Sequence, residues 1–305
     1  MCGSNCMAFK RRIFFTSPKD EFLEPPGRDI KHRILDRIRA EGYEPQQFFR
    51  EGLPKNVSWS FSNVRSVMQR CCGAVVLGLP RWSLQGAYGT VLMPTEFTHF
   101  EGAMAHAFQL PVLTIAPEGI PNRAVYWRGG DKVILTLPRG VGGEWVGGEE
   151  FNFRFCAWLE ELANRRDVFL GYCSKAIVAA QAIQLYLTKE LKLTVEDWAM
   201  DFRSGSTILD EIESAATKCT GGIFLFTNDD ELLKGDIHNA APRDNVLLEA
   251  GYFIRAKGKE RVLIIKETGV KMPADVGGTI YAALQDQHAT AAVETTIRRF
   301  VENNL

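Results

Sequence analysis

The sequence predicts an α/β protein with two flavodoxin-like or Rossmann-like domains, each built on a parallel sheet flanked by helices. Short segments rich in Val, Ile and Leu alternate with amphipathic segments, as is typical of parallel strands covered by helices. The 305 residues exceed the length of one usual core. The two halves also repeat one order of elements, with Glu101 and Glu249 at corresponding positions, although the identities are too few to establish a duplication.

The first half is predicted to alternate three strands with three helices. The expected strands are 11–18, 73–80 and 111–117, and the expected helices are 27–43, 58–71 and 94–110. A glycine-dense stretch at 137–150 then interrupts the pattern and gives the best boundary in the sequence. We therefore assign the first domain to residues 1–150 and the second to residues 151–305.

The second half repeats this plan. After a helix at 151–166, the expected strands are 167–174, 221–229 and 260–267, and the expected helices are 175–191, 206–219 and 242–258. Pro242 suits the first turn of the last of these helices, where Asp244 or Asn245 can accept hydrogen bonds from unpaired amides.

The composition is that of a soluble globular protein, with 46% hydrophobic and 24% charged residues. A net charge of −1 argues against nucleic-acid binding through bulk electrostatics. The seven cysteines include no Cys-x-x-Cys pair, so we expect no metal site and a reducing compartment. With no apolar run of membrane-spanning length and no signal-peptide core, we expect a cytoplasmic protein that does not bind a membrane.

Glu249 places a carboxylate in the otherwise apolar run at 241–254. On a helix it shares a face with Asn245, and it follows a predicted strand. It is therefore expected near the crevice at the carboxyl ends of the strands, where ligands bind in open parallel sheets. An acid there can stabilise a sugar carbon that becomes positive when its bond to a base breaks. The alternative is a structural acid paired with Arg243 or Arg255, and spacing alone leaves both interpretations open.

Three ordered motifs follow one another between residues 198 and 253: an aromatic segment with Gly-x-Thr-x-Leu, a strand ending in Thr-x-Asp-Asp, and Arg-x-Asn-Val-x-x-Glu-x-Gly-x-Phe. With these motifs, residues 167–284 resemble the TIR-like family of nucleotide-binding proteins, which supplies the TIR halves of bacterial antiviral effectors such as TIR-STING. The matching residues are Trp198, Phe202, Gly205, Thr207, Leu209, Thr227, Asp229, Asp230, Arg243, Asn245, Val246, Glu249, Gly251 and Phe253.

This resemblance implies a flavodoxin-like TIR fold that cleaves NAD+ to nicotinamide and ADP-ribose. Glu249 is then the catalytic acid, NAD+ is the substrate, and no cofactor is required. Trp198 and Phe202 are suited to stacking on a base, and the amides near Tyr172 to Ser174 to approaching phosphate. The full set of substrate-binding residues that we expect is Tyr172, Cys173, Ser174, Trp198, Phe202, Asp230, Arg243 and Asn245.

In the first half, the segment 97–113 resembles part of the nucleoside 2-deoxyribosyltransferase-like proteins. Glu101 corresponds there to the nucleophile that attacks the sugar, and the opening strand and loop are similar as well. The resemblance implies a nucleotide site that includes Ser17, Thr98 and Glu101. We consider three roles for this half: a binding domain for a nucleotide signal, which we favour, a second glycosidase, or a structural partner.

Together these observations predict an antiviral-defence effector that hydrolyses NAD+ when its N-terminal domain senses a nucleotide or cyclic nucleotide. We expect a homo-oligomer or filament on activation, because a toxic hydrolase must stay idle until it is signalled. The alternatives are a non-catalytic TIR-like module that binds a nucleotide, and a nucleotide or nucleoside N-glycosidase centred on Glu101.

Overall fold

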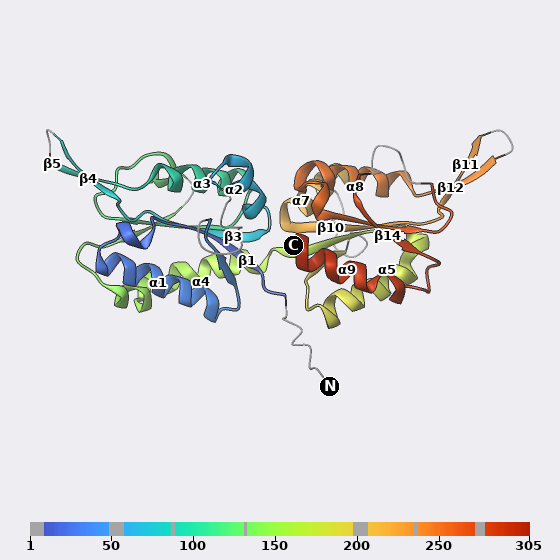
Figure 1. The fold of residues 1–305 in the computed structure, drawn as a ribbon, viewed down its shortest axis with the longest axis horizontal. Helices are drawn as coiled ribbons and strands as arrows, with labels where there is room; N and C mark the ends of the chain where they lie inside the picture. The colour runs from blue at the N-terminus through green and yellow to red at the C-terminus, as the bar shows by residue number, and fades with distance from the viewer. Residues whose placement is uncertain are drawn as a thin grey trace. The chain divides into compact units, whose positions relative to one another are not determined.

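The computed structural model describes residues 9–48, 58–86, 89–130, 133–197, 207–234, 237–271 and 278–305, without the side chains of 230–240. The chain divides into two compact units, Lys10–Asn164 and, with a short N-terminal segment, Arg165–Leu305 (Figure 1). Each unit is a parallel five-stranded sheet with helices on both faces, which confirms the predicted fold class. None of the helices in the described parts of the chain is both long and apolar enough to cross a membrane.

The sheet of the N-terminal unit has the strand order β2-β1-β3-β6-β7. Helices α1 and α4 cover one face, and α2 and α3 cover the other (Figure 1). The strands are β1 (Arg12–Thr16), β2 (Glu44–Gln46), β3 (Cys71–Leu77), β6 (Val112–Pro117) and β7 (Ile134–Leu137). The helices are α1 (Pro25–Ala40), α2 (Phe61–Met68), α3 (Glu96–Ala107) and α4 (Glu149–Ala163).

The C-terminal unit repeats this topology, with the strand order β14-β13-β10-β8-β9. Helices α7 and α8 cover one face, and α5 and α9 cover the other (Figure 1). The strands are β8 (Arg166–Gly171), β9 (Val195–Asp197), β10 (Cys219–Phe226), β13 (Val262–Glu267) and β14 (Ile280–Leu284). The helices are α5 (Ile177–Leu185), continued by a π-helical turn (Tyr186–Glu190), α7 (Ile208–Lys218), α8 (Asp244–Lys257) and α9 (Ala291–Asn304). Short 3-10 helices occupy Asp20–Phe22, Ala124–Tyr126, Gly143–Gly147, Ser174–Ala176 and Lys259–Arg261.

Each unit also contains a two-stranded antiparallel hairpin between its third strand in chain order and the helix that follows. The hairpins are β4 (Trp82–Gly86) with β5 (Gly89–Met93), and β11 (Asp230–Lys234) with β12 (Ile237–Ala241). The common strand order, and a hairpin at the same place in both units, show that one structural plan is used twice.

Helix α4 packs in the N-terminal unit, although our boundary after residue 150 placed it in the second domain. Its Phe155, Trp158 and Leu162 are buried in the core under β1 and β3. The Trp158 ring N–H also donates to the carbonyl of Pro111, 3.1 Å away, at the start of β6. The glycine-dense stretch is thus followed by a helix of the same unit, and the two units meet in the chain at residues 164 and 165.

Helix starts are fixed by the preceding residues. The hydroxyl of Thr95 accepts a hydrogen bond from the amide of Thr98 at the start of α3, and Thr207 forms a capping box with Asp210 on α7. Helix α8 differs from our prediction, because it begins at Asp244 with Arg243 as its N-cap and no side-chain cap. Pro242 therefore precedes the helix, and the predicted capping by Asp244 or Asn245 is wrong.

Candidate active site

The carboxyl end of the C-terminal sheet brings Glu249 against the backbone of β8. In a 2-1-3-4-5 sheet, the loops after the first and third strands diverge and leave a crevice between them. Glu249 lies on the second turn of α8, is 3% exposed, and sits beside the last residue of β8. A Cβ atom added to Gly171 would lie only 3.0 Å from its Oε2. The glycine therefore allows the carboxylate to approach the strand end.

Burial governs the electrostatics of the Glu249 carboxylate. Its Oε2 is buried and makes no hydrogen bond with the described residues. Burial raises the pKa of this carboxyl to about 7. Burial is the cause of this shift, with no contribution from Arg243 or Arg255, and both arginines are exposed, the first as the N-cap of α8 and the second in its last turn. A buried, unsatisfied acid is costly, and such groups are concentrated at functional sites.

Asp229 holds the start of α8 in place and so positions Glu249. Its Oδ1 accepts hydrogen bonds from the thiol of Cys173, at 2.7 Å, and from the hydroxyl of Thr227, at 2.8 Å. Its Oδ2 accepts one from the backbone N–H of Arg243, at 3.2 Å. Lys175 donates to its backbone carbonyl. One side chain, 5% exposed, thus connects the ends of β8 and β10 to the helix that presents the acid.

Two predicted substrate-binding residues have structural hydrogen bonds. The hydroxyl of Tyr172 donates to both carboxylate oxygens of Asp197, at 3.0 and 3.2 Å, and burial, followed by this carboxylate, raises its pKa. Burial and then Asp229 raise the pKa of the Cys173 thiol, which keeps it protonated as a donor. Both residues directly follow β8, at the carboxyl end of the sheet.

The other predicted residues are distributed unevenly around this point. Ser174, Arg243 and Asn245 are exposed, the first at a 3-10 turn after β8 and the others at the start of α8. Trp198 and Phe202 lie outside the described residues, as does the side chain of Asp230, whose backbone begins β11. Our set of site residues omitted Gly171 and Asp229. Asp229 belongs to the Thr-x-Asp-Asp motif, which was the signal available for it.

Glu101 occupies the equivalent position in the N-terminal unit. It is the sixth residue of α3, as Glu249 is of α8, and it is 5% exposed. Burial raises its pKa, while hydrogen bonds with Thr16 and Trp59 oppose the shift. The ring N–H of Trp59 donates to its Oε1 at 3.0 Å. The two acids therefore differ, because hydrogen-bond donors already engage Glu101.

The predicted nucleotide site of this unit is only partly brought together. A cavity of about 220 Å³ is lined by Ser17 and Glu101 but not by Thr98. The hydroxyl of Thr98 donates to the carbonyl of Thr95 at 2.8 Å and is bonded to the Tyr126 hydroxyl at 3.1 Å. Thr98 is thus used within the helix packing, and Thr95 lines the cavity in its place.

Comparison with known proteins matches the C-terminal half to a family. Residues 167–286 match the family model of the CAP12/Pycsar effector protein TIR domain. A CD-NTase-associated protein 12 from a Lachnospiraceae bacterium is 30% identical over 140 residues, which are 43% of this chain and 44% of that protein. The Pycsar effector proteins BcPycTIR of Burkholderia cepacia and PaPycTIR of Pseudomonas aeruginosa are each 29% identical over 36% of this chain and 37% of their own length.

The resemblance to TIR domains of effector proteins is thereby confirmed for the C-terminal half. The chain spans less than half the length of these curated relatives. The N-terminal unit lies outside the family match.

Proposed function

We propose that the C-terminal unit, a TIR domain of the CAP12/Pycsar effector type, hydrolyses NAD+ to nicotinamide and ADP-ribose in antiviral defence. The observation that supports this most is the carboxyl of Glu249, buried at the end of β8 with an unsatisfied oxygen. NAD+ is the substrate, and the reaction needs no separate cofactor.

The chemistry requires little beyond this carboxylate. The nicotinamide ring carries a positive charge in NAD+, so it leaves as a neutral molecule when its bond to the ribose breaks. The ribose carbon becomes positive in the transition state, and an ionised Glu249 close to it stabilises that charge. Water then adds to the carbon and releases a proton, which yields ADP-ribose.

Incubation with NAD+ followed by chromatography for free nicotinamide tests this function. The proposed hydrolase releases nicotinamide, and a non-catalytic module leaves NAD+ intact. Glu101 is also a buried acid, so an N-glycosidase centred on it is a second candidate. The Glu101→Gln and Glu249→Gln variants separate the two, because only the variant of the catalytic acid loses the release of the base.

The N-terminal unit is the proposed sensor of a nucleotide signal. Two observations support this role. One is the cavity beside Glu101, and the other is that a relative is named CD-NTase-associated protein 12. A cyclic nucleotide is accordingly the activator that we propose. Adding nucleotides to the NAD+ assay tests this role, which fails if none of them changes the rate.

We expect activity to depend on self-assembly into a homo-oligomer or filament. A hydrolase of a common metabolite must be idle before it is signalled, and assembly provides such control. The rate per subunit should therefore rise with protein concentration or with the activator. Measuring the rate across a dilution series, with light scattering in parallel, checks this. A flat rate at a constant small size would contradict it.

The pH dependence follows from Glu249. Its pKa of about 7 means that the carboxyl is protonated below this pH and ionised above it. Only the ionised form stabilises the positive sugar, so kcat/KM, which reports the free enzyme, should rise tenfold per pH unit below about 7 and level off above it. A profile of kcat/KM against pH, measured at NAD+ concentrations well below KM, checks this. A rate that is unchanged between pH 5.5 and 8 would contradict the role of this group.

A further inference from the structure

The cavity of the N-terminal unit lies at the carboxyl end of β1, beside Glu101. Ser17 and Thr95 add hydroxyl groups to its lining, while Phe22 and Phe97 add aromatic rings. The two phenylalanines are 41% and 39% exposed, so their rings are accessible at its mouth. The lining therefore offers hydrogen-bonding groups for a sugar and apolar rings for a flat base.

Glu101 is rigidly held at this cavity. Its Oε1 accepts the ring N–H of Trp59, and Trp59 packs edge-on against Phe97, with 5.0 Å between ring centroids. Thr16, at the end of β1, is also hydrogen-bonded to the acid. A fixed carboxyl that already has donors is suited to recognising ligand hydroxyl groups rather than to attacking a carbon.

Arg81 gives the cavity an anion-binding group. Its guanidinium stacks on Phe22, 3.9 Å from the ring centroid, and on Trp82, at 4.7 Å. Within the described part of the chain it has no carboxylate partner. The cation is thus oriented by aromatic rings while its donors remain available for an anionic ligand.

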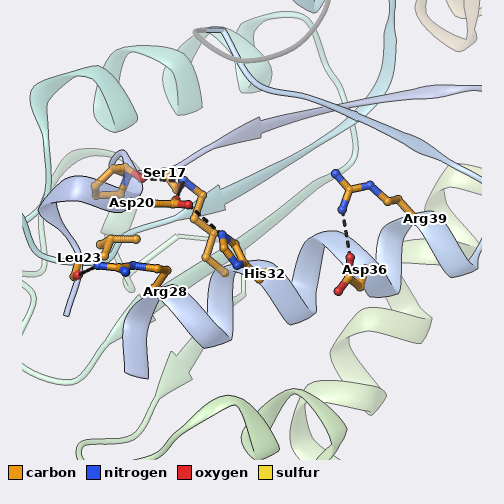
Figure 2. A network of polar contacts seen from close by, with 9 residues as sticks. Ser17, Asp20, Leu23, Arg28, His32, Asp36 and Arg39 are labelled. Carbon is orange, nitrogen blue, oxygen red and sulfur yellow. Dashed lines mark hydrogen bonds and ion pairs between the residues drawn. The ribbon is translucent and has the colours of Figure 1, made fainter. Parts of the chain in front are cut away.

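Lys31, which also lines the cavity, has a different role. It is 1% exposed, and its Nζ donates to the carbonyl of Pro18 at 2.8 Å and pairs with Asp20 at 2.9 Å. Asp20 is bonded to His32 as well, at 2.8 Å, beside Ser17 in the loop after β1 (Figure 2). This network fixes the loop that forms one wall, and it leaves the positive charge of Arg81 for the ligand.

The size of the cavity limits the ligand. Its volume of about 220 Å³ is small even for one nucleotide, since pockets that enclose drug-sized ligands measure about 300–1,000 Å³, so part of a bound nucleotide would lie between the exposed rings of Phe22 and Phe97 and a second nucleotide would find no room inside. We propose that this cavity binds one nucleoside monophosphate, linear or 3′,5′-cyclic, with its sugar at Glu101 and its phosphate at Arg81, and that it excludes dinucleotides such as NAD+. The proposal rests on the sensor role proposed above for this unit.

Calorimetry on the full-length Glu249→Gln variant tests this, because NAD+ is not consumed by the proposed reaction in that variant. The probes are AMP, UMP, their 3′,5′-cyclic forms, adenosine and uridine, with NAD+ as competitor. We expect at least one monophosphate to bind and Arg81→Gln to weaken it tenfold or more. Binding of the matching nucleoside should change less than threefold. NAD+ at a tenfold excess should leave monophosphate binding unchanged.

Two control variants keep the result specific. Arg128→Gln removes the same charge from an exposed position outside the cavity lining and should not affect binding. Arg81→Lys keeps the charge and should bind more tightly than Arg81→Gln. The proposal is overturned if no monophosphate binds. It is also overturned if the Arg81→Gln variant binds a monophosphate as tightly as the protein that retains Arg81, or if NAD+ displaces the bound monophosphate. Release of nicotinamide by the wild type is measured separately, so failure of the hydrolase and failure of this site are distinguishable.

Discussion

Replacing Gly171 with alanine is expected to lower the free energy of unfolding by about 1–3 kcal/mol. The same substitution should lower the rate of NAD+ hydrolysis at least tenfold. The added Cβ would lie 2.5 Å from Cδ1 of Phe224 and 3.0 Å from Oε2 of Glu249. Phe224 is fully buried and packs against the rings of Phe169 and Phe253. It therefore has little room to move, and the carboxylate is displaced from the strand end.

Chemical denaturation and the NAD+ assay measure the two effects, and Gly251→Ala provides the control. Gly251 lies inside α8, where a Cβ would meet no atom within 4 Å. Alanine there should raise stability by about 0.5–1 kcal/mol, because it is a better helix former. Wild-type stability and activity in Gly171→Ala would show that Glu249 is not held against β8.

The alternation of apolar strands and amphipathic helices was sufficient to predict the architecture. The buried strands β3 and β10 are continuous apolar segments, and helices such as α1 have one clear apolar face. The hairpins were not predicted. All five residues of β4 are exposed, so no alternation of buried and exposed positions marks it as a strand. Strands β2 and β9 contain three residues each and are too short for a periodic signal.

The contacts of Glu101, and those of Asp229 at the start of the helix that carries Glu249, could not be derived from local patterns. Sequence identified Glu249 because it interrupts an apolar segment, and Glu101 because it lies at the corresponding position of the first half and matches a family motif. Trp59 lies 42 positions before Glu101 in the chain, and Cys173 lies 56 positions before Asp229. Folding alone brings these pairs together. The same holds for helix α4, whose unit is decided by which core its apolar face meets.

Replacing Glu249 with glutamine is expected to reduce the release of nicotinamide by about a hundredfold or more, which is typical for the loss of a charge that stabilises a transition state. Glutamine keeps the shape of the side chain but removes its charge. Because the site is buried, water screens little of the interaction that is lost. Glu249→Ala should be as inactive.

The same substitution should not destabilise the fold. The pKa of Glu249 rises from 4.5 in the unfolded chain to about 7 in the folded protein, so the folded state holds the proton more tightly. The contribution of Glu249 to the free energy of unfolding therefore falls as the pH rises from about 4.5 to 7 and stays lower above that, by about 3 kcal/mol. At pH 8 the glutamine variant should be at least as stable as the wild type, and this difference should shrink toward pH 5.

The most direct measurement is the rate of nicotinamide release from NAD+ at pH 8 by the wild type and the Glu249→Gln variant. The two proteins are compared in the same oligomeric state, after the variant has been shown to be folded. The wild type should release one nicotinamide for each NAD+ consumed, and the variant should release almost none while remaining folded. A folded, equally assembled glutamine variant that cleaves NAD+ at a comparable rate would show that Glu249 is structural and that the catalytic site lies elsewhere.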